Sequence, residues 1–197
     1  MLIKSATAIA ANIINELKAK QEERDVWKNS IFSGADNLKL DYSGKIGELF
    51  LVEVCTRSEL PFSYDEDKID EAGHYDIEIL NRKVEVKTAR RSSNGAYQHE
   101  GLRQDGSDYY AFADLNPQDD SITLTVLDTK RTNLSKKHPV LGRTPHLRKG
   151  TTDVFKFDFG AATHKRALQA GVAIKITQQT SVAEVESFLR KRIKNNK

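Results

Sequence analysis

A mixed β-sheet flanked by helices, an α/β (α+β) architecture, is the fold predicted by this 197-residue sequence. Apolar residues recur at helical spacing in the first 57 residues, and four segments between residues 74 and 128 alternate polar and apolar side chains. A strand, a helix, a strand and a helix then complete the order, which is typical of helices packed on a mixed sheet. The length favours one domain over residues 1–197.

Two helices are expected before the sheet. Apolar side chains at helical spacing predict the first over residues 5–27, within an N-terminal helical segment (1–40). The second is predicted over residues 44–57, capped by Asp41 or Ser43. The apolar stripes of the two helices are Ile9, Ile13, Ile14 and Leu17, and Ile46, Leu49, Phe50 and Val54.

The strands follow in two groups. Residues 74–80 and 83–88 alternate polar and apolar side chains around a turn at Asn81-Arg82, which predicts a hairpin, and residues 108–115 and 121–128 predict two more strands. A basic loop (129–152) separates this central core (43–128) from closing strands and helices (153–197). The closing elements are expected at 154–159, 161–170, 171–177 and 181–194, the last with a capping box at Ser181 and Glu184.

Composition narrows the functional class. The chain has 38% hydrophobic and 30% charged residues and no run of about 18 apolar residues, so we expect no membrane span and no membrane partner. The polar residues after the first turn argue against a signal peptide. The single cysteine, Cys55, excludes an internal disulfide and a multi-cysteine zinc site. A cytoplasmic location and a core position for Cys55 are expected.

Charge is distributed unevenly along the chain. Residues 1–129 carry 15 Lys and Arg against 24 Asp and Glu, a net charge of −9, whereas residues 130–197 carry 16 against 4, a net charge of +12. A basic final third is typical of a protein that binds a polyanion, and a solvated basic tail is the alternative.

The predicted hairpin carries the candidate catalytic residues. Asp76 lies on its first strand, and Glu85 and Lys87 lie on one face of its second strand because strand side chains repeat every two residues. On adjacent strands of a hairpin, the Asp76 and Glu85 carboxylates are expected to lie within a few ångström of each other. Two carboxylates at that separation repel each other, and a divalent cation such as Mg²⁺ relieves that repulsion. Lys87 is then placed to stabilise transition-state charge or to hold an attacking water.

This pattern resembles the PD-(D/E)XK nuclease superfamily, which includes the type II restriction endonucleases. Asp76 matches the first acid of that signature, Glu85-Val86-Lys87 matches Glu-X-Lys, and Glu48 in Gly44-Lys-Ile-Gly-Glu48 matches a glutamate on the preceding helix. The resemblance covers residues 43–128. It departs at Tyr75, where the family usually has proline.

The resemblance implies a restriction-endonuclease-like fold and a Mg²⁺-dependent endodeoxyribonuclease acting on double-stranded DNA, with Mn²⁺ as a substitute metal. Asp76, Glu85, Glu48 and the Val86 carbonyl would hold the metal, and Lys87 would complete the catalytic set. A type II restriction enzyme, working as a homodimer to cut both strands, is the first expectation. Alternatives are a structure- or damage-directed repair, recombination or phage nuclease, and a non-catalytic DNA-binding module. Glu78 is a second acid on the Asp76 face: a solvent-exposed strand end is expected for it, and the alternative is that it replaces or assists Asp76.

Two segments are predicted to contact DNA. The polar loop after the second hairpin strand offers donors suited to bases or phosphates: Arg90, Arg91, Asn94, Gln98, His99 and Arg103. The basic loop contains seven cations and no acid between residues 130 and 149, and we expect it to order on DNA. Its cations are Lys130, Arg131, Lys136, Lys137, Arg143, Arg148 and Lys149. His138 and His146, in the same loop, are expected at the surface.

Overall fold

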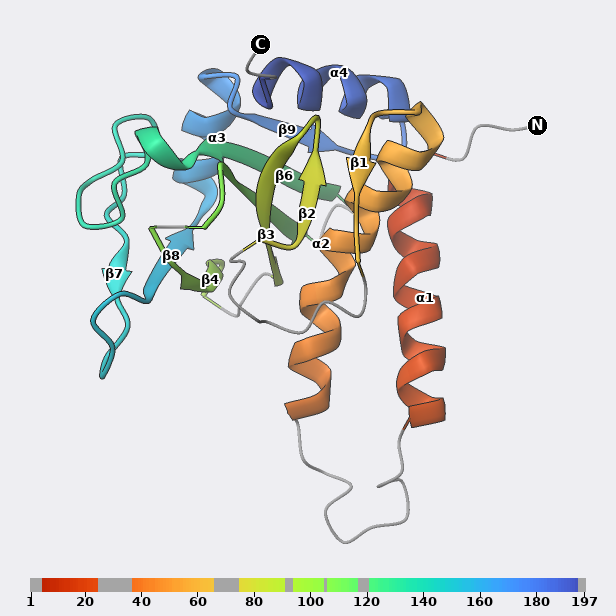
Figure 1. Ribbon diagram of the computed structural model, residues 1–197, viewed down its shortest axis with the longest axis horizontal. Coiled ribbons are helices and arrows are strands. Elements are labelled where there is room, and N and C mark those ends of the chain that lie inside the picture. The colour runs from red at the N-terminus through yellow and green to blue at the C-terminus, as the bar shows by residue number, and fades with distance from the viewer. Residues whose placement is uncertain are drawn as a thin grey trace, which may run out of the picture.

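A computed structural model describes residues 5–24, 37–65, 75–90, 94–104, 106–116 and 121–194. Six strands form the larger sheet in the order β1-β2-β3-β5-β6-β9. Neighbouring strands in it are antiparallel except β3 and β5, which run parallel (Figure 1). Its strands are β1 (Phe62–Ser63), β2 (Ile77–Ile79), β3 (Arg82–Arg90), β5 (Tyr109–Asn116), β6 (Ser121–Asp128) and β9 (Ala173–Ile176).

A smaller, three-stranded antiparallel sheet has the order β4-β8-β7. Its strands are β4 (Tyr97–Leu102), β7 (His146–Leu147) and β8 (Phe155–Phe159). β4 belongs to the connection between the parallel strands β3 and β5, which explains why a segment outside the main sheet separates them along the chain.

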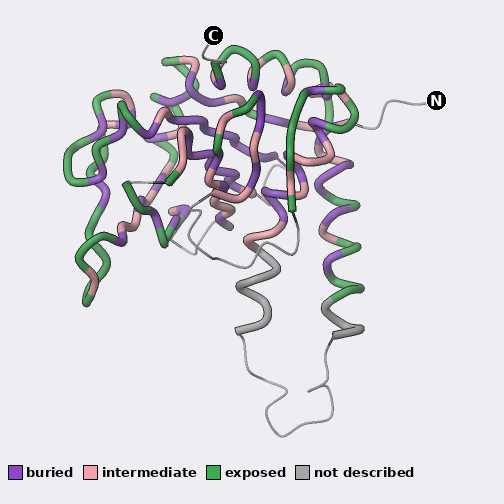
Figure 2. The backbone as a smooth tube through the Cα atoms, in the orientation of Figure 1, coloured by how far each residue is buried: buried purple, intermediate pink, exposed green. Residues whose placement is uncertain are grey.

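Four helices complete the described fold. They are α1 (Ala6–Arg24), α2 (Asn37–Ser58), α3 (Ala161–Gln169) and α4 (Val182–Arg192). α1, α2 and α4 bury apolar side chains against one face of the large sheet. The small sheet and α3 bury a second apolar cluster against the other face. The large sheet is therefore the middle layer of the molecule, and its central strands are buried on both faces (Figure 2).

The predicted fold class is confirmed: the chain folds as a mixed sheet flanked by helices. The apolar stripe of α1 is buried as expected, at Ile9, Ile13 and Leu17, and Cys55 lies in the core. The capping box at Ser181 and Glu184 begins α4. None of the described helices is long and apolar enough to cross a membrane.

Several predicted boundaries are wrong. α2 begins at Asn37, so Asp41 and Ser43 lie inside the helix rather than capping it. The short strands β1 and β7 and the strand β4 were not predicted. β1 and β7 have two residues each and β4 has six, which is too few for alternation to distinguish a strand from a loop. β4 is also interrupted by a register shift between His99 and Leu102.

The basic loop over residues 129–152 is packed onto the fold instead of standing free. It begins with a 3₁₀ turn at Thr129–Arg131, and Leu134 and Leu141 are fully buried in the second apolar cluster. His138, expected at the surface, is 6% exposed, and its Nδ1 accepts the Leu141 N–H at 3.2 Å. Apolar residues spaced through the segment anchor it, so its order does not depend on a polyanion.

Candidate active site

The hairpin of β2 and β3 positions Asp76. Leu80 and Asn81 both have positive φ, 53° and 59°, as a tight two-residue hairpin turn requires. The turn therefore lies one residue earlier than the predicted Asn81-Arg82. It fixes the register so that Asp76, just before β2, donates its N–H to Val84 O at 3.0 Å. The Asp76 carboxylate oxygen Oδ2 accepts the Val86 N–H at 2.6 Å.

Glu85 and Lys87 form an ion pair on β3, with side chains 14% and 25% exposed. Burial lowers the pKa of the Lys87 amine, but nearby Glu85, Asp76 and Glu48 offset this and hold its pKa above the ordinary value. Lys87 is therefore a charged amine that feels all three predicted carboxylates at once.

Glu48 reaches this cluster from α2. Its residue is 7% exposed, and burial together with the neighbouring Asp76 carboxylate raises the pKa of Glu48. Lys45 and Tyr64 act in the opposite direction: Lys45 Nζ lies 2.6 Å from Oε2 of Glu48, and the Tyr64 hydroxyl donates to the same oxygen at 3.3 Å. The Glu48 carboxylate is thus held in one orientation by two donors.

α2 lies close to β3 at the level of Glu48. The Gly47 N–H donates to Oγ1 of Thr88 at 3.0 Å, and the same hydroxyl donates to Gly44 O at 2.8 Å. The Gly-X-X-Gly-Glu sequence of the helix and the Thr after Glu-X-Lys are thus partners in one contact, which sets the helical glutamate beside the hairpin.

Four predicted residues from three places in the chain, Glu48, Asp76, Glu85 and Lys87, therefore act on one another electrostatically. Lys45 and Tyr64 were not predicted. Lys45 stands three residues before Glu48, a spacing that brings helical side chains together and would have allowed the prediction. Tyr64 follows a two-residue strand and carries no such local signal.

The cluster offers Mg²⁺ several oxygen ligands. Carboxylate oxygens are suitable hard ligands, and the Val86 carbonyl lies on the same strand edge as its N–H, which faces Asp76. Each carboxylate, however, currently contacts a nitrogen: Lys45, the Val86 amide or Lys87. Within the described residues, no three acidic, His or Cys side chains are grouped closely enough to hold a metal as they stand. The donors are therefore of the kind that Mg²⁺ prefers, but in the arrangement described they are engaged by these nitrogens.

The predicted polar loop after β3 is mostly strand. Arg91 lies outside the described residues, and the structure places Arg90 at the end of β3 without describing its side chain. Asn94 is exposed in a turn and Gln98 is exposed on β4. Arg103 is also exposed, with its side chain 3.8 Å from Asp153.

The prediction that His99 faces DNA is wrong. His99 is 1% exposed, and its ring packs against Phe112 and Phe159 at centroid distances of 4.7 and 5.0 Å. Its Nε2 lies 2.9 Å from Oδ1 of Asp114, which is fully buried. The alternation of β4 sends His99 inward between exposed neighbours, and a loop prediction could not assign that face.

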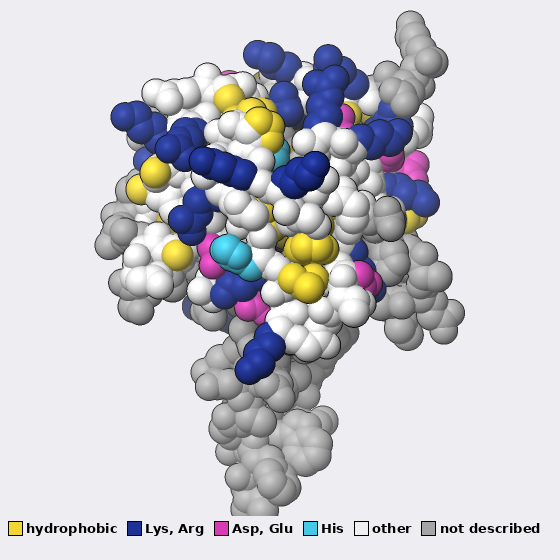
Figure 3. Space-filling model, turned by 90° about the vertical axis from the view of Figure 1, so that its left-hand side faces the viewer, with side chains coloured by type: hydrophobic (Ala, Val, Ile, Leu, Met, Phe, Trp, Pro, Cys, Tyr) yellow, Lys and Arg dark blue, Asp and Glu magenta, His cyan; other side chains and the backbone are white. Residues whose placement is uncertain are grey.

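The cations of the 129–152 segment face outward. All seven predicted cations are exposed: Lys130, Arg131, Lys136, Lys137, Arg143, Arg148 and Lys149. Figure 3 shows the face that carries β7 and β8, where Lys and Arg side chains outnumber acidic ones. Arg131, 88% exposed, is 3.7 Å from Asp128. A buried apolar side and an exposed basic side make this segment a fixed, positively charged surface.

Searches of protein-family models and of curated proteins find no match. Among solved structures, the chain is similar to a bacterial homing endonuclease, with a TM-score of 0.36 and 13% sequence identity, over 61% of this chain and 74% of that one.

Proposed function

We propose that the protein is a Mg²⁺-dependent endonuclease that hydrolyses phosphodiester bonds in double-stranded DNA. The observation that carries the proposal is the cluster formed by Glu48, Asp76, Glu85 and Lys87. Three acids and one half-buried, charged lysine from separate elements are costly to hold together for stability alone. Clusters of interacting ionisable groups concentrate at functional sites.

The cluster matches the requirements of phosphodiester hydrolysis. A divalent ion bound there would neutralise phosphate charge and lower the pKa of a water molecule. Lys87 supplies a positive charge next to that region, available to the attacking water or to the phosphate oxygens in the transition state. Glu85 orients the Lys87 amine, and the Val86 N–H orients the Asp76 carboxylate.

The lysines explain how three acids coexist before metal binding. Lys45 is paired with Glu48 and Lys87 with Glu85. Asp76, Glu85, Glu48 and the Val86 carbonyl would hold Mg²⁺ or Mn²⁺, and a bound cation would compete with the two amines for their carboxylates. We propose that Lys87 is the amine that acts on substrate.

DNA binding is supported by the fixed basic surface over residues 129–152. It bears seven exposed cations, and phosphate contacts of this kind supply most of the sequence-independent affinity for DNA. We infer a sequence-specific restriction-type enzyme acting as a homodimer, since two sites are needed to cut both strands of a palindrome. A structure- or damage-directed nuclease is the second candidate.

Digestion of a long, unmethylated DNA tests the proposal. The reaction is run with Mg²⁺, with Mn²⁺ and with EDTA, using the wild type, Asp76→Asn, Lys87→Ala and Glu78→Gln. Asp76→Asn keeps an oxygen that accepts the Val86 N–H and so preserves the hairpin. Glu78→Gln is the matched control because it removes an acid on β2 opposite Lys83, outside the cluster.

Metal-dependent cleavage by the wild type and Glu78→Gln, lost in the other two variants by at least about a hundredfold, is expected. Discrete fragments would identify sequence-specific cleavage, and a smear would favour the second candidate. If methylated, branched and single-stranded DNA also stay intact while DNA is still bound, the protein is a non-catalytic binding module and the proposal is wrong.

A further inference from the structure

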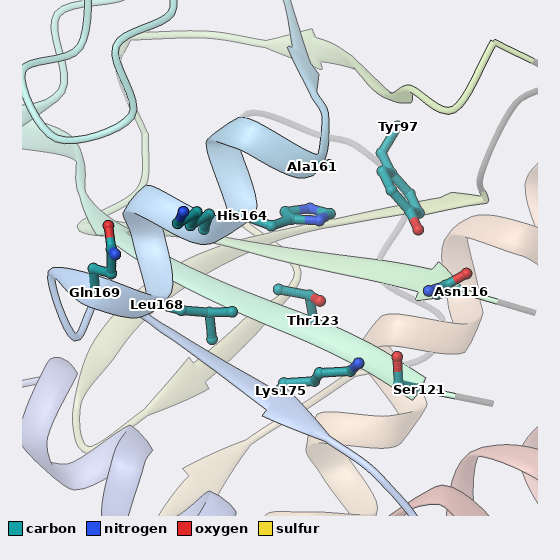
Figure 4. Close-up of a pocket in the computed structure, with 10 residues that line it drawn as sticks. Tyr97, Asn116, Ser121, Thr123, Ala161, His164, Leu168, Gln169 and Lys175 are labelled. Carbon is teal, nitrogen blue, oxygen red and sulfur yellow. The ribbon is translucent and has the colours of Figure 1, made fainter. Parts of the chain in front are cut away.

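A hollow of about 390 Å³ lies between α3 and the sheet formed by β5, β6 and β9. Figure 4 shows His164 extending into it from α3, and Thr123 and Lys175 entering it from the sheet. Lys165, on α3, also contributes to its lining. The described lining includes three basic side chains and several hydroxyl or amide groups, but no Asp or Glu. Such a lining suits an anion.

His164 is fixed from behind by a buried carboxylate. Its Nε2 lies 2.6 Å from Oδ2 of Asp114, whose side chain is fully buried. Burial raises the pKa of Asp114, but His99 and His164 more than offset this and lower it, so the carboxylate is ionised. Because Nε2 contacts Asp114, Nδ1 is the His164 ring nitrogen left to meet a ligand. The Tyr97 ring, 4.9 Å away between centroids, limits the movement of the imidazole.

We propose that this hollow binds a phosphate group, with His164, Lys165 and Lys175 as its basic ligands. Lysine and imidazolium are strong partners for phosphate oxygens, and the neighbouring Thr123 hydroxyl adds a donor from the sheet. The volume is within the range of small-ligand sites and accommodates a mononucleotide.

The position of the hollow suggests two sources of that phosphate. Asn116, in its lining, lies four residues beyond Phe112, which pairs with Lys87 across the parallel strands. Phe112 and Asn116 lie on the same face of the sheet, and their Cα atoms are about 13 Å apart at 3.3 Å per residue. The phosphate therefore comes either from a free nucleotide or from a DNA strand that also crosses the Lys87 cluster. The DNA source rests on the proposed function, and the free nucleotide does not.

Calorimetric titration with deoxyadenosine 5′-monophosphate tests the site, with deoxyadenosine as the phosphate-free control. Affinity for a DNA duplex is measured in parallel at several salt concentrations. The variants are His164→Gln and Lys175→Ala. Lys191→Ala removes an equally exposed lysine from α4, on the opposite face of the sheet, and is the matched control. Measurements in a Lys87→Ala background separate this site from the proposed cleavage.

Lys175→Ala and His164→Gln are each expected to lower the affinity for the mononucleotide or for DNA by about tenfold. Lys191→Ala is expected to leave both affinities unchanged. If a variant binds the mononucleotide more weakly but binds DNA with unchanged affinity, the phosphate comes from a free nucleotide. A salt slope for DNA that falls by about 0.9 supports a strand phosphate. The proposal is overturned if neither variant changes binding of either probe relative to Lys191→Ala, or if deoxyadenosine binds as tightly as its monophosphate.

Discussion

Thr88 and Gly47 join β3 to the helix that carries Glu48. The Thr88 hydroxyl accepts the Gly47 N–H at 3.0 Å, and a Cβ on Gly47 would lie 2.5 Å from that same oxygen. It would also lie 3.1 Å from Cγ1 of Val86 and 3.2 Å from Cβ of Ala113. Only glycine lets the helix backbone come this close to β3, so the distance between Glu48 and the hairpin depends on an absent side chain.

Gly47→Ala is therefore expected to destabilise the fold by about 1–3 kcal/mol, the usual cost of overpacking a filled site. Gly44→Ala, in the same helix, meets nothing within 4 Å and is expected to stabilise by about 0.5–1 kcal/mol through helix propensity. Urea unfolding measures both. Equal effects of the two substitutions would show that the contact with Thr88 does not constrain the helix.

Glu48→Gln is expected to change how stability depends on pH. A carboxyl whose pKa is raised by folding stabilises the protein below its ordinary value of 4.5, and that contribution is lost as pH rises through the raised pKa. Glutamine does not titrate. The free energy of unfolding of Glu48→Gln should therefore rise relative to wild type between pH 4 and pH 7.

The measurement is urea unfolding at a series of pH values. Glu53, on the same helix, has a side chain that is 36% exposed and paired with Arg57, and it supplies the control substitution Glu53→Gln. A difference between Glu48→Gln and wild type that stays constant with pH would contradict the raised pKa of this carboxyl.

Asp114→Asn removes a buried charge that two histidines share. Breaking such a pair typically costs about 3–5 kcal/mol, and that loss is expected at pH 7. Because folding lowers the pKa of Asp114, its contribution is present above the ordinary value of 3.8 and is lost as pH falls through the lowered pKa. The stability curves of variant and wild type should converge in that acidic range.

Exposed Asp153, 3.8 Å from Arg103, gives the comparison substitution Asp153→Asn, for which a change within about 0.5 kcal/mol is expected. Thermal or urea unfolding between pH 3 and pH 7 distinguishes the two. An Asp114→Asn protein as stable as Asp153→Asn would mean that the two histidines do not depend on the carboxylate.

Replacing Lys136 and Lys137 together by glutamine is expected to flatten the salt dependence of DNA affinity. Each lost phosphate contact lowers the slope of log K against log salt by about 0.9. Both residues are exposed on the basic segment, so the fold should be unchanged. The same double change at Lys191 and Lys194, near the C-terminal end of α4, should leave the slope unaltered. Equal slopes for both pairs would exclude the segment as a phosphate-binding surface.

Local sequence was enough to predict most elements, and the resemblance to a nuclease signature pointed to the members of the charged cluster. Alternation located β3, β5 and β6, and helical spacing located the buried stripe of α1. These elements depend on residues close together in the chain, where periodicity directly reports which side faces the core. The cluster combines Glu48 with Asp76, Glu85 and Lys87, and it could be expected only because the order of these residues matches that signature.

Long-range contacts could not be predicted. The burial of His99 depends on β4 joining a second sheet with β8, about sixty residues later, and on Asp114 lying beneath it. The contact of Tyr64 with Glu48 depends on a two-residue strand. In each case tertiary packing determines which residues the polar side chain contacts, and it overrides the local preference of the sequence.

Leu134 and Leu141 have a consequence for how this protein can diverge. They fasten the basic segment to the second apolar cluster, while the cations between and around them face water. Outward residues can therefore be exchanged with small effects on stability, whereas the leucines cannot. Related proteins should vary freely in the pattern of charge they present to a ligand while keeping the same anchors, so that new preferences arise without a new fold.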